Sequence, residues 1–199
     1  MIARLCLIAL CLCARPLHAD CITAADLDQG IRATLADDGV EEYRAIGENL
    51  IELRNDYGDG VVTNILLAHG VYVIDVFDTE NGQPVAEGRT VTRYPVTIDA
   101  MPLPEAGGTW QVAVELADAG GISTEQQSHR WEKPTTVTYD GCTYEAIPGT
   151  IRYDYPDGWY IEELLYLPAI GIGLLTASED NVEGRYVFAP YVSFAALGN

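Results

Sequence analysis

The sequence predicts an all-β fold: an antiparallel meander of about ten to twelve strands that forms a half-barrel, a barrel or a sandwich, with one short N-terminal helix. Apolar and polar side chains alternate with a period of two over most of the chain, which is typical of half-buried strands. Turn residues, among them Asp38-Gly39 and Asn81-Gly82, interrupt this alternation at short intervals. Only residues 23–30 show helical features.

The helix is expected at residues 23–30, because Thr23 is a suitable N-cap and Asp26 falls in the first turn. Strands follow in close succession, and the Gly, Asn and Asp residues between them tolerate the positive φ that tight turns require. In the first half of the chain we expect strands over residues 31–36, 40–46, 50–54, 61–68 and 71–77.

The middle of the chain contains a further strand and a connection. Residues 109–116, TWQVAVEL, alternate between large apolar side chains on one face and mainly polar ones on the other, which predicts a half-buried strand. Residues 95–108 contain three prolines and two glycines. Proline cannot donate a backbone hydrogen bond, so we expect an extended connection or a sheet edge there.

Residues 149–175 contain an aromatic-rich hairpin. Residues 156–158, Pro-Asp-Gly, are expected to form a three-residue loop with the glycine in the left-handed region. The return strand, 159–167, is apolar on both faces apart from Glu162 and Glu163, so we expect it in the centre of the fold with both faces covered. Further strands are expected at residues 174–178 and as a pair within residues 184–196.

The element LLYLPAIGIGLL, residues 164–175, is a strand that ends in Tyr-x-Pro, followed by glycines and a second apolar strand. It resembles an element of uncharacterised Gram-negative periplasmic proteins with a curved β-sheet, which are distantly similar to the lipoprotein-carrier fold. The resemblance covers a small part of the chain. It implies an exported protein with a curved antiparallel sheet.

Residues 1–19, MIARLCLIALCLCARPLHA, have the layout of a secretory signal peptide, with Arg4 before an apolar run and the small residue Ala19 at the end. The apolar run is shorter than the roughly 20 residues that span a bilayer, which disfavours the alternative of an uncleaved anchor. We therefore expect a signal peptide at residues 1–19, a single β domain at residues 20–199, and a periplasmic or secreted location. No membrane-spanning segment is expected after cleavage.

Two cysteines, Cys21 and Cys142, remain after the signal peptide. Exported proteins fold in an oxidising compartment, so we expect these two residues to form a disulfide, with two free buried thiols as the alternative. The bond would close a loop long enough to stabilise the fold by about 4–5 kcal/mol. It would also fasten the new N-terminus to the second half of the chain.

Acidic residues dominate the charge. The 11 Lys and Arg residues lose Arg4 and Arg15 with the signal peptide, which leaves nine against 30 Asp and Glu residues and a formal net charge of −21. Such a charge repels nucleic acid and anionic membrane surfaces, so neither is expected as a partner. A solvated acidic surface that keeps an exported protein soluble explains this composition.

No motif predicts a catalytic residue, a metal site or a cofactor. His69 and His129 lack a second histidine or a cysteine at ligand spacing. The neighbouring acids Glu41-Glu42 and Glu162-Glu163 lie in predicted strands, where adjacent side chains point to opposite faces, so neither doublet forms a catalytic pair. Two acids on facing strands could still meet across the gap that a glycosidase requires.

Aromatic side chains around the hairpin are the candidate ligand-binding residues: Tyr153, Tyr155, Trp159, Tyr160 and Tyr166. Such amphipathic rings can line a groove, although cross-strand pairing within the hairpin also explains them. We expect a soluble, exported, non-enzymatic protein that binds an apolar small molecule, a lipid or an envelope protein's peptide on its sheet. The alternatives are an exported hydrolase with paired carboxylates, or a structural or assembly protein of the cell envelope.

Overall fold

A computed structural model describes residues 21–56, 58, 60–85 and 88–198. The expected signal peptide, residues 1–19, lies outside the described residues. The described part of the chain forms one antiparallel sheet with two short 3-10 helices and no α-helix. The all-β prediction is therefore confirmed.

The elements follow one another with short connections. In chain order they are η1 (Ala24–Asp28), β1 (Ile31–Leu35), β2 (Val40–Gly47), β3 (Leu50–Asp56), β4 (Val61–Ala68), β5 (Tyr72–Glu80), β6 (Gln83–Pro84), β7 (Thr90–Arg93), η2 (Ile98–Ala100), β8 (Thr109–Asp118), β9 (Gly121–Trp131), β10 (Thr135–Tyr139), β11 (Cys142–Tyr155), β12 (Gly158–Leu167), β13 (Ile172–Asp180), β14 (Gly184–Val187) and β15 (Tyr191–Ala196).

The sheet is a meander, because most strands pair with their neighbours in the sequence. Its order is β14-β13-β12-β11-β9-β8-β7-β5-β4-β3-β2-β1-β15, with β10 added beside β11 and β6 beside β5. Two pairs, β9 with β11 and β5 with β7, skip one strand, and β15 returns from the C-terminus to pair with β1. The sheet is not closed, since β14 and β15 lie at opposite ends of the order. A closed barrel is thus not formed.

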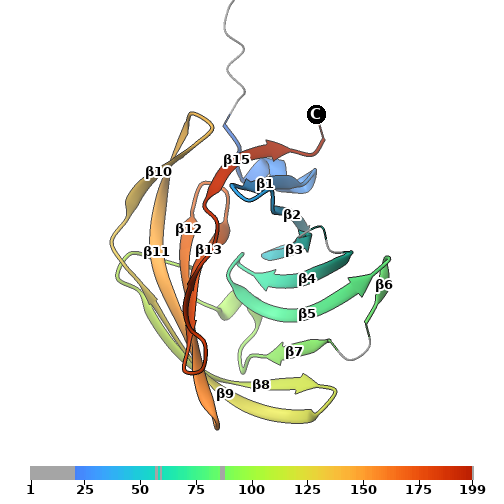
Figure 1. Cartoon of the computed structure of the whole chain (residues 1–199). Coiled ribbons are helices and arrows are strands. Elements are labelled where there is room, and N and C mark those ends of the chain that lie inside the picture. Colours follow the sequence, from blue (N-terminus) through green and yellow to red (C-terminus); the bar gives the residue numbers. More distant parts are fainter. Residues whose placement is uncertain (1–20, 57, 59, 86–87, 199) are drawn as a thin grey trace, which may run out of the picture.

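The sheet bends so that its two ends face each other (Figure 1). Strands β1 to β5 and β7 are stacked in one wall, which we call the N-terminal wall. Strands β11, β12 and β13 form the opposite wall, called here the C-terminal wall, and the long β8–β9 hairpin lies at the base where the walls meet. The inner faces of these two walls form the interior of the protein.

Two apolar clusters join the walls. The first combines N-terminal residues such as Ile31 and Leu53 with Ile172 and Leu174 of β13 and with Phe194 of β15. The second packs the turn between β4 and β5 against the C-terminal wall and contains Ala68, Val71, Tyr72, Met101, Trp131, Ile147, Ile151, Leu164 and Tyr166. Burial of this apolar surface is the main force that holds the two walls together.

A close backbone contact between the walls involves three glycines, and we call it the glycine contact. The backbone N–H of Gly173 donates to the carbonyl oxygen of Gly70 at 2.9 Å. A Cβ atom at Gly70 would lie 2.1 Å from the carbonyl oxygen of Gly171, and Gly70 has a φ of +72°. Glycine is required at position 70 both for this conformation and for the close approach.

The disulfide between Cys21 and Cys142 is present, which confirms the sequence prediction. It fastens the segment before η1 to the first residue of β11. Ile22 and Leu27, which flank and belong to η1, are 8% and 6% exposed and pack in the first cluster. The disulfide therefore attaches the N-terminal segment to the C-terminal wall at the point where it covers the core.

Three local predictions need correction. The short helix expected at residues 23–30 is a 3-10 helix of five residues, although Thr23 and Asp26 interact as expected, with the Thr23 N–H donating to Asp26 Oδ2 at 2.8 Å. Gly30, at a φ of +101°, ends it before an α-helix can develop.

The sheet contains 15 strands, more than the ten to twelve expected, because short or polar strands such as β6 and β9 lack a clear apolar alternation.

The aromatic hairpin differs from the expectation at its turn. Tyr155 pairs directly with Gly158, so the loop contains Pro156 and Asp157 alone. Gly158 does not adopt a positive φ; it is needed because a Cβ atom there would lie 2.3 Å from Oδ1 of Asn181. The returning strand β12 is buried at Leu164, Tyr166 and Leu167, whereas residues 159–163 are only partly buried, so the covering expected for both faces is found in its C-terminal half alone.

Within the described ranges, no helix has the length and apolar character that crossing a membrane would require.

Candidate ligand-binding site

A cavity of about 70 Å³ lies between the two walls, and we call it the interwall cavity. Most of its lining is apolar and comes from β3, β4, β5, β12, β13 and the turn between β4 and β5: Leu53, Ile65, Leu67, Gly70, Val71, Val73, Leu164, Gly173 and Leu175. Five polar residues complete the lining: Glu41, Tyr43, Asn55, Glu162 and Tyr191. The cavity thus combines apolar walls with a small set of polar groups.

Glu41 lies on the inner face of β2 and is 4% exposed. Its Oε2 accepts hydrogen bonds from the hydroxyl groups of Tyr43 at 2.5 Å and of Tyr191 at 2.8 Å. Burial raises the pKa of Glu41 above its ordinary value, although the two tyrosine hydrogen bonds act in the opposite direction. The carboxyl group is therefore held in place by residues from two strands that are distant in the sequence.

Glu162 contributes the second carboxyl group of the interwall cavity, from the opposite wall. The hydroxyl of Tyr153, on the paired strand β11, donates to its Oε2 at 2.6 Å. Burial raises the pKa of Glu162, and the charge of Glu125 acts in the same direction. Two carboxyl groups from facing walls thus line one cavity, and both favour the protonated form more than an exposed glutamate does.

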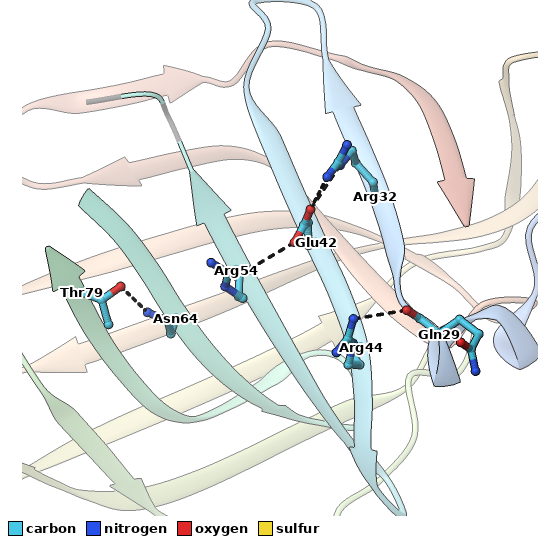
Figure 2. A network of polar contacts seen from close by, with 7 residues as sticks. All are labelled: Gln29, Arg32, Glu42, Arg44, Arg54, Asn64 and Thr79. Atoms are coloured by element: carbon cyan, nitrogen blue, oxygen red, sulfur yellow. Dashed lines mark hydrogen bonds and ion pairs between the residues drawn. The ribbon is translucent and has the colours of Figure 1, made fainter. Parts of the chain in front are cut away.

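The neighbouring acid of β2, Glu42, lies on the opposite, outer face. Figure 2 shows Glu42 between Arg32 and Arg54, whose guanidinium groups lie 2.6 and 3.3 Å from its Oε1 and Oε2. These three residues are directly opposite one another on β1, β2 and β3. The doublet Glu41-Glu42 therefore divides as expected from strand geometry, with one acid inside and one paired at the surface.

A larger hollow of about 740 Å³ lies on the outer face beside this row of charges. Its lining contains Asp37 and Asp56 together with the arginines. The two aspartates accept hydrogen bonds from the backbone N–H groups of Gly39 and Gly58 in their own turns. Because most of its charged groups, Asp38 excepted, already pair with one another or stabilise turns, we regard the interwall cavity as the better candidate despite its smaller size.

A cluster of polar side chains, separate from the interwall cavity, is buried on β9 at the base of the fold. Gln127 donates through Nε2 to Glu125 Oε1 at 2.9 Å, and its Oε1 accepts from the Tyr94 hydroxyl at 3.0 Å. The same Oε1 lies 3.2 Å from Nε2 of His129, which assigns the ring proton to Nε2. Within the described residues, Nδ1 of His129 is then a buried acceptor without a hydrogen-bond partner.

His129 is expected to titrate far below the ordinary range, since burial lowers its pKa to about 4. Below pH 6.5 the His129 imidazole of the unfolded chain gains a proton, whereas that of the folded chain stays neutral. The contribution of the neutral ring to the free energy of unfolding is therefore fully present above pH 6.5 and is lost as the pH falls toward 4. The loss is about 3 kcal/mol. NMR titration of the imidazole resonances, assigned with His129→Gln, measures the midpoint directly.

The pH dependence of the unfolding free energy also contains contributions from three buried acids. Burial raises the pKa of Glu125, Glu41 and Glu162, so their protonation stabilises the fold as the pH falls and opposes the effect of His129. The difference in unfolding free energy between the native chain and His129→Gln isolates the histidine. A midpoint near 6.5 would show that the ring is solvated and would contradict the structure.

The five aromatic residues predicted to bind ligand are only partly brought together. Tyr153 and Tyr160 are directly opposite each other, with ring centroids 5.8 Å apart. Tyr155 is 41% exposed at the end of the hairpin. Tyr166 is buried beside Trp131, and Trp159 lies on the opposite face of β12, where the guanidinium of Arg152 stacks over it. Their role in ligand binding stays a prediction.

Glu41 and Glu162, in contrast, were not among the candidate residues. A signal for Glu162 existed, because it shares the period-two face of β12 with Tyr160, Leu164 and Tyr166 and is the only acid there. Glu41 likewise shares its face with Tyr43 and Ala45. An acid on the apolar face of an alternating strand indicates a buried carboxyl group, but not which second carboxyl group it meets.

No protein-family model matches this sequence, and neither a search of curated proteins nor a search of solved structures finds a similar protein. The resemblance of residues 164–175 to periplasmic curved-sheet proteins therefore stays a prediction. Function depends on the geometry and chemistry of the site rather than on the fold.

Proposed function

We propose that this protein binds a compact, largely apolar ligand in the interwall cavity and does so without catalysis. The supporting observation is the cavity lining, in which apolar side chains from both walls surround a few polar groups, as in many ligand sites. The volume of about 70 Å³ exceeds the roughly 10–15 Å³ that one water needs and is below the roughly 300 Å³ of common ligand pockets. The ligand is a small molecule or one end of a lipid.

We also infer a periplasmic or secreted location for this activity. The disulfide between Cys21 and Cys142 supports it, because such bonds persist in oxidising compartments. The residues that would form the signal peptide have a suitable layout in the sequence. Fractionation of cells that express the full chain tests this, and accumulation of the uncleaved chain in the cytoplasm would contradict it.

Filling the cavity is expected to abolish ligand binding. Val73 lines the cavity from β5, and Val73→Phe places a ring in the space that the ligand occupies. The purified protein is incubated with an extract of envelope lipids and small molecules, and the bound molecules are identified by native mass spectrometry. We expect the native chain to retain a ligand and Val73→Phe to lose at least about ninety per cent of it, a tenfold loss of affinity or more.

The matched control is Val182→Phe, which makes the same change at a side chain that is 84% exposed. Circular dichroism establishes that each variant is folded, and Val73→Leu, with one added methylene, is used if the phenylalanine variant does not fold. A native protein that emerges empty would refute the proposed function. Equal retention by the native chain and the filled variant would place the ligand elsewhere.

A second candidate function is hydrolysis of a glycoside by paired carboxyl groups. The specific observation in its favour is that Glu41 and Glu162 line the same cavity from facing walls, and that burial raises the pKa of both. The small volume counts against it, since the substrate has to place a sugar ring between the acids. A screen of glycosides with the native chain and Glu162→Gln decides, because turnover that the variant retains would exclude this mechanism.

A further inference from the structure

We propose that the ligand of the interwall cavity carries a protonated amine, which donates hydrogen bonds to Glu41, Glu162 and Asn55. This inference rests on the proposed ligand-binding function and adds the chemical class of the ligand.

Three acceptor groups of the lining have capacity to spare. The two carboxyl groups are each held through Oε2 by tyrosine hydroxyls, whereas no described residue donates to Oε1 of Glu41 or of Glu162. Oδ1 of Asn55 is buried and likewise has no hydrogen-bond partner among the described residues. A buried acceptor without a donor is costly, so a ligand that donates to Oδ1 of Asn55 gains free energy, and hydrogen bonds to the two Oε1 atoms add to it.

The described lining offers no cationic donor to match them, and the amide NH2 of Asn55 is its neutral donor. The hydroxyl groups of Tyr43 and Tyr191 both donate to Glu41, and the described residues that line the cavity include no lysine, arginine or histidine. A ligand with a carboxylate or phosphate head would therefore meet carboxyl groups and find no cation. The cavity selects against anions, which include fatty acids and phospholipid headgroups.

A protonated amine satisfies these groups better than a neutral donor such as a hydroxyl. An ammonium group has three N–H donors, which equals the number of acceptor groups with spare capacity. Its charge also favours the ionised carboxylates that burial alone disfavours at Glu41 and Glu162. The acidic character of the whole chain adds long-range attraction for a cation.

The carbon part of the ligand would contact the apolar lining. Leu53, Leu67 and Val73 of the N-terminal wall and Leu164 and Leu175 of the C-terminal wall surround the polar groups. The limited volume favours a short or branched alkyl amine, or the amine end of a longer ligand.

Three probes with one carbon skeleton test the proposal: isobutylamine, isobutanol and isobutyrate at pH 7. Titrations followed by two-dimensional NMR report binding through the amide resonances of cavity residues such as Val73 and Leu164. We expect isobutylamine to bind about tenfold more tightly than isobutanol, and isobutyrate not to shift these resonances. Glu162→Gln should remove most of the preference for the amine, and Glu41→Gln should act in the same direction.

The control variant is Glu145→Gln, which removes one charge from an exposed position on β11 and should leave the preference unchanged. Equal affinities for the three probes, or absence of amine binding, would overturn the amine assignment. Neither result would refute ligand binding itself, which is decided separately by the molecules that the native chain and Val73→Phe retain from the extract. If Glu41→Gln does not fold, the comparison of isobutylamine with isobutanol is made with Glu162→Gln alone.

Discussion

Replacement of Cys142 by serine is expected to lower the free energy of unfolding by about 5 kcal/mol, because the lost disulfide no longer restricts the unfolded chain. Cys21 and Cys142 are 121 residues apart, so the bond closes a very long loop. The folded state also loses the attachment of η1 to the C-terminal wall. Urea unfolding followed by tryptophan fluorescence measures the change, as a lower midpoint and a steeper slope, because the unfolded chain without the bond exposes more surface.

Cys21→Ser is the matched control, since either substitution removes the same bond. Both variants should have the same stability, equal to that of the native chain unfolded in the presence of a reductant, and the reductant should not affect either variant. An unchanged midpoint in reductant would show that the bond contributes nothing to stability.

Gly70→Ala is expected to destabilise the fold by about 2–5 kcal/mol. The left-handed conformation costs a residue with a Cβ atom roughly 1–2 kcal/mol, and the overlap with the carbonyl oxygen of Gly171 adds roughly 1–3 kcal/mol. Because Gly70 and Gly171 lie on opposite walls, the added methyl group forces the walls apart at the glycine contact. Thermal unfolding by circular dichroism measures the loss.

Gly82→Ala separates the two causes. Gly82 has nearly the same backbone conformation, with a φ of +75°, but no atom lies within 4 Å of a Cβ atom built there. This variant should therefore lose only the roughly 1–2 kcal/mol of conformational cost. If Gly70→Ala loses no more than Gly82→Ala, the close contact between the walls does not exist in solution.

Local features of the fold follow directly from the sequence. Strand β8 matches the alternation of residues 109–116, and the turn residues Asp38 and Asn81 adopt the expected positive φ, at 70° and 51°. These features depend on neighbours a few residues away, and so the pattern of side chains specifies them. The disulfide was predicted for a simpler reason: if residues 1–19 are removed on export, Cys21 and Cys142 are the two cysteines that remain, and an oxidising compartment favours their pairing.

Strand β9 shows why other features could not be read in advance. Its inward-facing side chains Glu125, Gln127 and His129 are 8%, 2% and 2% exposed, yet all are polar. Hydrogen bonds within the strand and to Tyr94 compensate this burial, except at Nδ1 of His129. A polar sequence indicates a solvated surface by default, and only the partners supplied by other elements make it suitable for the interior.

The amino-acid sequence alone thus specifies most of the strands, most turns, the pairing of Cys21 with Cys142 and the acidic character of this protein, because each depends on local spacing or on composition. The bend that brings Glu41 of β2 to the same cavity as Glu162 of β12 depends on the order of strands and on contacts such as that of Gly70 with Gly173. An alternating pattern shows which face a carboxyl group lies on, but the opposite wall determines whether it meets water, a tyrosine or a second acid. The candidate site is therefore a property of the folded chain.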